Sequence, residues 1–184
     1  MSLFEYIMVL TSILIGLGIA ELLSGIVRML RSDFKEGFYL PQILWSSFLF
    51  LYLIIVWWSR WDLRENFHWT FLQLLMSLAG PVMAFIAAGL MFARNRTAKE
   101  YYFRQQKTMF TILPLIAFSS LIHEVVIEGT SLLSFTTFMA SLLVISTLLP
   151  RFFKKDWIHL VCSFSANAVF IFWVLSSLYL ISAR

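Results

Sequence analysis

The stretch GLGIAELLSG (residues 16–25) lies inside an apolar segment that extends from residue 3 to residue 29. As a helix, a segment of this length can cross the ~30 Å hydrocarbon core of a bilayer. The stretch contains one carboxylate, Glu21, among glycine, alanine and serine residues. Because hydrocarbon penalises charge, the sequence predicts a membrane helix in which Glu21 has a specific role.

The composition of the whole chain agrees with this prediction. Of its 184 residues, 60% are hydrophobic and 13% charged, and the mean hydropathy is +0.84. A soluble domain contains about 25% charged residues. Further apolar segments lie at residues 40–59, 69–92, 108–127, 131–149 and 157–181. We therefore predict an all-α integral membrane protein whose single domain (residues 1–184) is a bundle of six transmembrane helices.

The distribution of Lys and Arg predicts the orientation of this bundle. With six spans, the first, third and fifth loops lie on one side and carry eleven of the 14 Lys and Arg residues. The other side carries Arg60, Arg64 and Arg184. Positive charge marks cytoplasmic loops, so both termini are expected outside, in the periplasm of a bacterial inner membrane.

Small residues predict that the helix around Glu21 packs against protein. At ~100° per residue, Gly18 and Gly25 lie within about 60° of Glu21. An adjoining ridge consists of Gly16, Ala20 and Ser24. Small residues let a second helix approach closely, so we expect a helix-packing face here and a homo-oligomer.

Three interpretations of Glu21 remain open at the level of sequence. In the first, the carboxyl is protonated and hydrogen-bonded and so specifies helix packing. In the second, it is an ion or proton site in a pathway. Desolvation raises the pKa of a carboxyl, which keeps both of these open at neutral pH. In the third interpretation it extends toward the cytoplasmic interface and pairs with a neighbouring loop or with Arg28, two helical turns further along.

Other polar residues complete the predicted site. Gln73 and Asn167 lie in apolar segments and are candidate partners of Glu21 on a polar pathway. The outer end of the fourth segment contains His123, Glu124 and Glu128. These residues form either a cation-attracting or pH-sensing mouth or a solvated helix end. Their spacing is not diagnostic of a metal site, so we expect no metal.

The longest inner loop, residues 93–107, is basic. It includes Arg94, Arg96, Lys99 and Arg104. Such a loop can contact membrane lipids with anionic headgroups or a cytoplasmic protein partner, or it can simply carry the positive charge of an inner loop. A net charge of +4 concentrated beside the membrane does not indicate nucleic-acid binding.

The two halves of the chain show a short internal similarity. IAELLSG (19–25) resembles IHEVVIEG (122–129), and HWTFLQLLMS (68–77) resembles DWIHLVCSFS (156–165). A repeat of three spans has to be inverted, which is a frequent architecture among transporters. We therefore consider a 3+3 inverted repeat as a hypothesis.

The segment LFEYIMVLTSILIGLGIAELLSGIVRMLR (3–31) and the motif YYFRQQ (101–106) resemble a family of small multi-pass bacterial inner-membrane proteins of unassigned function. The resemblance extends over most of the chain. It implies a helical bundle in a bacterial inner membrane, and it implies no activity and no site residues.

The sequence favours an oligomeric channel or transporter-like protein for an ion or small solute, with Glu21 on its polar pathway. The alternative is a non-transporting sensor or scaffold subunit that acts through a cytoplasmic partner. No phosphate-binding loop, nucleophile elbow or other catalytic motif is present, so we expect neither an enzyme nor a cofactor.

Overall fold

A computed structural model describes residues 3–31, 38–60, 70–92, 97–122, 131 and 134–182, and within these ranges the chain is all-helical, with no strand. In these described ranges, six α-helices and one 3-10 turn follow each other. They are α1 (Leu3–Arg31), α3 (Leu40–Ser59), α4 (Phe71–Met91), α5 (Ala98–Ile122), α6 (Phe135–Leu148), η3 (Leu149–Arg151) and α7 (Asp156–Ser182).

Four of these helices are long and apolar enough to cross a membrane. They are Phe4–Arg31, Leu40–Ser59, Phe71–Met91 and Asp156–Ser176. Helix α5 begins at Ala98, before the predicted start of the apolar segment at residue 108, so its first half is polar. Helix α6 is short. The four long apolar helices indicate a membrane protein, whereas crossing by all six helices remains a prediction.

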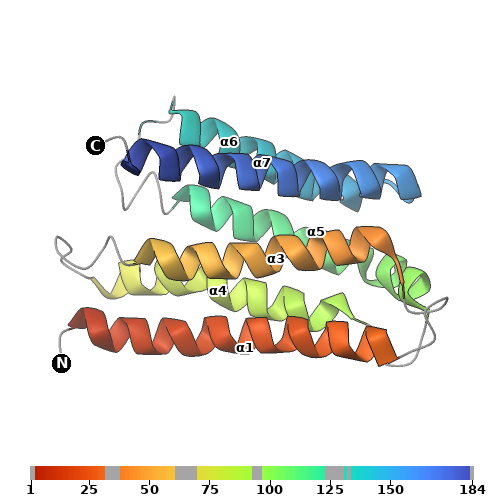
Figure 1. Ribbon diagram of the computed structural model, residues 1–184, viewed down its shortest axis with the longest axis horizontal. Coiled ribbons are helices and arrows are strands. Elements are labelled where there is room, and N and C mark those ends of the chain that lie inside the picture. Colours follow the sequence, from red (N-terminus) through yellow and green to blue (C-terminus); the bar gives the residue numbers. More distant parts are fainter. Residues whose placement is uncertain are drawn as a thin grey trace.

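The helices alternate in direction (Figure 1), and their contacts form a closed ring. Around this ring, α1 packs on α4, α4 on α5, α5 on α6, α6 on α7, α7 on α3 and α3 on α1. Helix α3 also contacts α4. The start of α1 and the end of α7 lie at the same end of the bundle (Figure 1).

Aromatic side chains fill the centre of the ring. Trp45 of α3 meets Phe110 of α5 edge to face, with ring centroids 5.4 Å apart. Phe48 meets Phe170 of α7 in the same way, also at 5.4 Å. These four rings are almost wholly buried, so the centre of the bundle formed by one chain is filled by hydrophobic packing.

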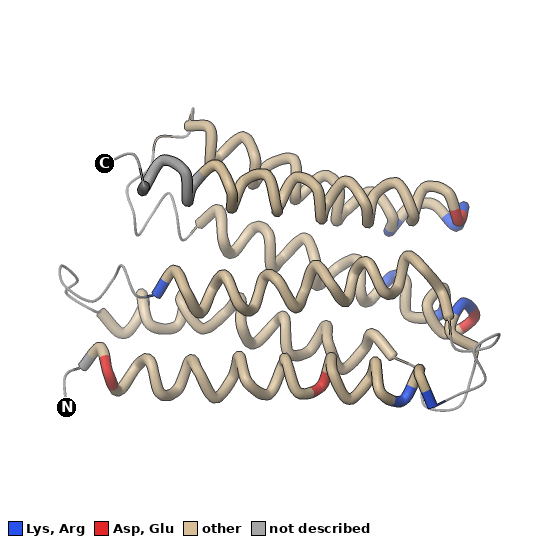
Figure 2. The backbone as a smooth tube through the Cα atoms, in the orientation of Figure 1, with Lys and Arg blue, Asp and Glu red and all other residues tan. Residues whose placement is uncertain are grey.

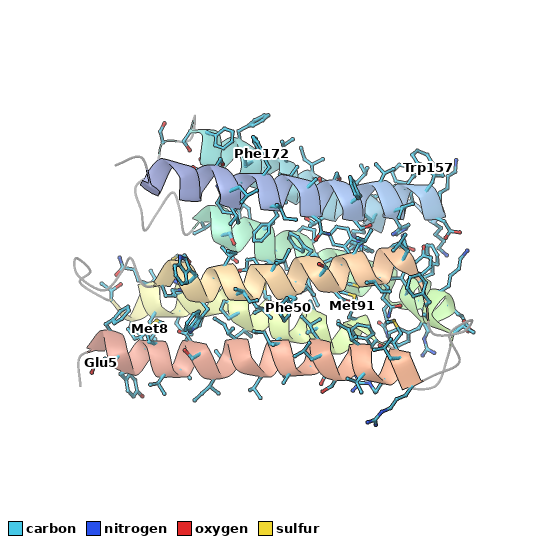
Figure 3. All side chains as sticks on the ribbon, in the orientation of Figure 1. Glu5, Met8, Phe50, Met91, Trp157 and Phe172 are labelled. Atoms are coloured by element: carbon cyan, nitrogen blue, oxygen red, sulfur yellow. The ribbon has the colours of Figure 1, made fainter. Side chains whose placement is uncertain are left out.

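The outer surface is apolar along its length and charged at its ends. Trp157 and Phe172 point away from the bundle and are 62% and 57% exposed, whereas Met91 is buried (Figure 3). Figure 2 shows that most of the described Lys and Arg residues gather at one end of the bundle. Arg60 directly follows α3, whose last residue lies at the opposite end (Figure 1). An apolar belt between polar ends is the surface that a bilayer stabilises.

The two halves of the chain pack differently. Helix α1 packs more extensively on α4 than on α3. In the second half, α5 and α7 each pack more extensively on α6 than on each other, and they meet at one end of the bundle, where Tyr102 and Phe103 contact His159. The packing therefore does not support the inverted-repeat hypothesis.

Pro81 lies inside α4 and removes one hydrogen bond of that helix. The carbonyl that would accept from residue 81 belongs to Ser77, four residues earlier. Arg60, which is buried at the end of α3, donates from Nη2 to this oxygen at 2.8 Å. A side chain from the neighbouring helix thus replaces the bond that the proline removes.

We expect Arg60→Met to lower the free energy of unfolding by about 1–3 kcal/mol, because it leaves the Ser77 carbonyl without this donor. In a Pro81→Ala background the helix can bond that carbonyl itself, so the same substitution is expected to cost less than half as much. Unfolding in mixed detergent micelles measures both costs.

Comparing the two backgrounds cancels the other contacts of Arg60. Equal costs with and without Pro81 would show that Arg60 does not act through the Ser77 carbonyl.

Candidate functional site

Glu21 and Arg28 form an ion pair on α1. Arg28 Nη2 donates to Glu21 Oε1 at 3.1 Å, across two turns of the same helix. The two side chains remain 37% (Arg28) and 32% (Glu21) exposed. Of the three arrangements considered for Glu21, the structure contains the pairing with Arg28.

The small residues of α1 divide between two sides of the helix. A Cβ on Gly18 would lie 2.9 Å from Leu53 of α3, and one on Gly25 would overlap the Phe92 ring, so both glycines permit close contacts within the chain. A Cβ on Gly16 would meet no atom within 4 Å. The ridge of Gly16, Ala20 and Ser24 is exposed.

Helical geometry puts Glu21 at the boundary between these two sides. Gly18 and Gly25 lie about 40–60° from Glu21 in one direction, and Ser24 lies about 60° away in the other. The ion pair therefore lies beside the exposed ridge, at the edge of the surface that packs on α3 and α4.

Gln73 and Asn167 are not close to Glu21. Gln73 forms a capping box with Thr70 at the start of α4, in which each residue satisfies a backbone N–H of the other. Asn167 Nδ2 donates to the Leu44 carbonyl (2.9 Å) and to the Ser163 carbonyl (2.8 Å), which links α7 to α3. The structure therefore does not assemble these three residues into one pathway within a single chain.

Several predicted residues lie outside the part of the chain that the structure describes. They are Arg94 and Arg96 of the basic loop, and His123, Glu124 and Glu128 of the predicted outer mouth. Lys99 and Arg104 are described, and both are exposed on α5. Among the described ranges, no group of three or more His, Cys, Asp and Glu side chains could hold a metal ion.

His159 is the centre of a polar cluster that the sequence does not predict. Its side chain is fully buried, and Nε2 lies 2.8 Å from the Phe153 carbonyl. A carbonyl only accepts, so Nε2 carries a proton and Nδ1 accepts from the Tyr102 hydroxyl at 2.9 Å. The rings of Phe103 and Phe110 pack against the imidazole at 5.1 and 5.5 Å.

Gln106 connects the same cluster to the turn before α7. Its amide nitrogen donates to the carbonyls of Pro150 (2.6 Å) and Phe153 (2.7 Å). The side chain is 2% exposed. Gln106 and His159 therefore share the Phe153 carbonyl, and together they hold η3 and the start of α7 against α5.

Asp156 closes the cluster at its exposed edge. Lys99 Nζ of α5 lies 2.5 Å from Asp156 Oδ2, and the Tyr39 hydroxyl donates to Oδ1 at 3.1 Å. Burial, and then the neighbouring carboxylate, raise the pKa of Tyr39 above its usual value, while burial raises the pKa of Tyr102. Both phenols therefore stay protonated at neutral pH and act as donors.

The chemistry of this cluster is hydrogen bonding between helix ends. Its members Tyr39, Lys99, Tyr102, Gln106, Asp156 and His159 come from α3 and its entry, from α5 and from α7. The motif YYFRQQ (101–106) contains two of them, Tyr102 and Gln106. A polar run directly before an apolar segment was the signal in the sequence that could have indicated this cluster. The partners of Tyr102 and Gln106 lie 44 to 57 residues away in the sequence, which no local pattern shows.

We expect Gln106→Met to lower the free energy of unfolding by about 1–2 kcal/mol, because two backbone carbonyls lose a buried donor. Gln105→Met is the matched control, since Gln105 is the next residue and is less buried. Thermal unfolding in detergent measures both. A loss in the control as large as that of Gln106→Met would assign the effect to the substitution of glutamine rather than to the contacts of Gln106.

Comparison of the chain with models of protein families, with curated proteins and with solved structures finds no match. Two features have chemistry beyond packing: the Glu21–Arg28 pair on α1 and the basic end of the bundle.

Proposed function

We propose that the chain is the subunit of an oligomeric membrane channel or transporter-like protein for an ion or small solute, and that it assembles through α1. The observation that carries this proposal is the partly exposed Glu21–Arg28 ion pair beside the exposed ridge of Gly16, Ala20 and Ser24. The proposed location is the bacterial inner membrane, with the basic end in the cytoplasm.

The cost of exposing charge to hydrocarbon supports assembly through this face. Helix α1 is one of the four helices that can cross a membrane, and Glu21 lies well inside it. A second copy packed on the ridge would replace lipid around the ion pair with protein or water. Gly16, Ala20 and Ser24 carry no bulky side chain there, so two such helices can approach closely.

The packing of the core supports a pathway between subunits rather than through one chain. Trp45, Phe48 and Phe110 occupy the centre of the ring and are at most 1% exposed. A closed symmetric oligomer would bring the Glu21 carboxylates of its subunits toward a common axis. Each Glu21 comes with its Arg28 partner, so such a pathway carries both signs of charge and the proposed solute is an ion or a small solute.

The assembly is tested with Ala20→Ile, which puts a branched side chain on the ridge. We expect the oligomer to dissociate, measured as a change of mass by light scattering in detergent. Ala168→Ile is the matched control, because Ala168 is an exposed alanine on α7. An unchanged oligomer in Ala20→Ile, or equal dissociation in both variants, would rule out assembly through α1.

Transport is tested by ion flux into liposomes that contain the protein. We expect Glu21→Gln to lower the flux on the order of tenfold. A loss of about 1.4 kcal/mol of stabilisation of the solute at the barrier has that effect on a rate. Glu5→Gln, on the same helix near its end, is expected to leave flux unchanged. If the intact wild-type oligomer conducts no ion under any gradient, the transport proposal fails and the scaffold alternative is favoured.

A further inference from the structure

Two exposed basic residues and a threonine share one face of α5. Arg104, Lys107 and Thr111 are spaced by three and four residues, so they follow each other along the helix surface. All three side chains are exposed. Glu100, one turn before Arg104, is the acidic residue on this face of α5.

The turn η3 adds a third cation to this face. Arg151 Nη1 donates to the Lys107 carbonyl at 3.0 Å and also contacts Thr111 Oγ1. Its place is set by the neighbouring residue, because the Pro150 carbonyl is bonded to the buried Gln106 of α5. We name Arg104, Lys107, Thr111 and Arg151 the α5–η3 patch. Even with Glu100 included, its charge is clearly positive.

The depth of the patch is that of a membrane interface. Next to Arg151 along the chain, Phe152 is 68% exposed, and Trp157 is 62% exposed. Beyond Lys107 and Thr111 the exposed positions of α5 become apolar, with Leu115 and Phe118 about half exposed. Aromatic side chains beside cations, next to an apolar surface, are typical of the level of the lipid headgroups.

We propose that the α5–η3 patch binds the headgroup of an anionic phospholipid from the cytoplasmic leaflet. A guanidinium held by two contacts to α5 presents its remaining N–H groups in a fixed direction, which suits a phosphate. Lys107 and Arg104 add charge on the same face, while Phe152 and Leu115 are placed to contact acyl chains. This site is separate from α1 and does not depend on the proposed transport function.

The experiment is native mass spectrometry of the full chain in detergent with phosphatidylglycerol or phosphatidylcholine. The wild type is expected to retain phosphatidylglycerol preferentially. Arg104→Gln/Lys107→Gln is expected to weaken this binding roughly 25-fold, at about fivefold per charge. Adding Arg151→Gln is expected to bring the loss to roughly 100-fold. The double variant keeps the contacts of Arg151, so it tests the site even if the triple variant unfolds.

A matched control removes the same charge elsewhere at the same end of the bundle, with Arg31→Gln/Lys154→Gln/Lys155→Gln. A smaller loss in this control than in the triple variant supports the patch, whereas an equal loss assigns binding to diffuse surface charge and overturns the proposal. Displacement of the lipid by millimolar inorganic phosphate would indicate a site for soluble anions instead. Equal retention of the two lipids by the wild type would also overturn the proposal, and would favour an acidic protein partner.

Discussion

The requirement that every backbone carbonyl inside a membrane finds a donor organises this bundle. Hydrocarbon supplies no hydrogen bonds, so a carbonyl released by a proline or by a helix end has to be satisfied by a side chain. Arg60 does this for Ser77, and Gln106 does it for the Pro150 carbonyl at the interfacial end of the bundle. Asn167 adds a bond to the Leu44 carbonyl. Each of these bonds joins different helices, so the polar groups that solve a local problem also determine which helices are neighbours.

The buried polar groups, such as Arg60, Gln106 and His159, are thus engaged in bonds within the chain, and the middle of the bundle is aromatic. The rings of Trp45, Phe48, Phe110 and Phe170 exclude water from the centre. The Glu21–Arg28 pair and the α5–η3 patch both lie at surfaces that other molecules can cover. The chemistry of this protein is therefore expected where it meets lipid or another subunit.

Hydropathy predicted the apolar helices well, because burial in lipid is a local property of sequence. The segment 40–59 coincides with α3. The start of α5 at Ala98 was missed, since residues 98–107 are polar and hydropathy does not report a helix whose end is solvated. For Glu21 the sequence supplied the partner as one of three possibilities, because Arg28 is on the same helix. The cluster around His159 could not be predicted, because Tyr39 and Asp156 are 117 residues apart and meet only in the folded chain.

Helix length adds a consequence for the surrounding bilayer. Helix α1 and helix α6 lie on opposite sides of the bundle (Figure 1). The apolar helical stretch on the α6 side covers Phe135–Arg151, about 26 Å, whereas the span of α1 covers Phe4–Arg31, about 42 Å. A bilayer of uniform thickness cannot match both, so it thins beside α6 or α1 tilts. An assembly with α1 at its axis would turn the α6 side, with its shorter apolar length, toward the lipid. Such an assembly would favour thin regions of membrane. It would also attract other proteins of short apolar length, because they deform the bilayer in the same way.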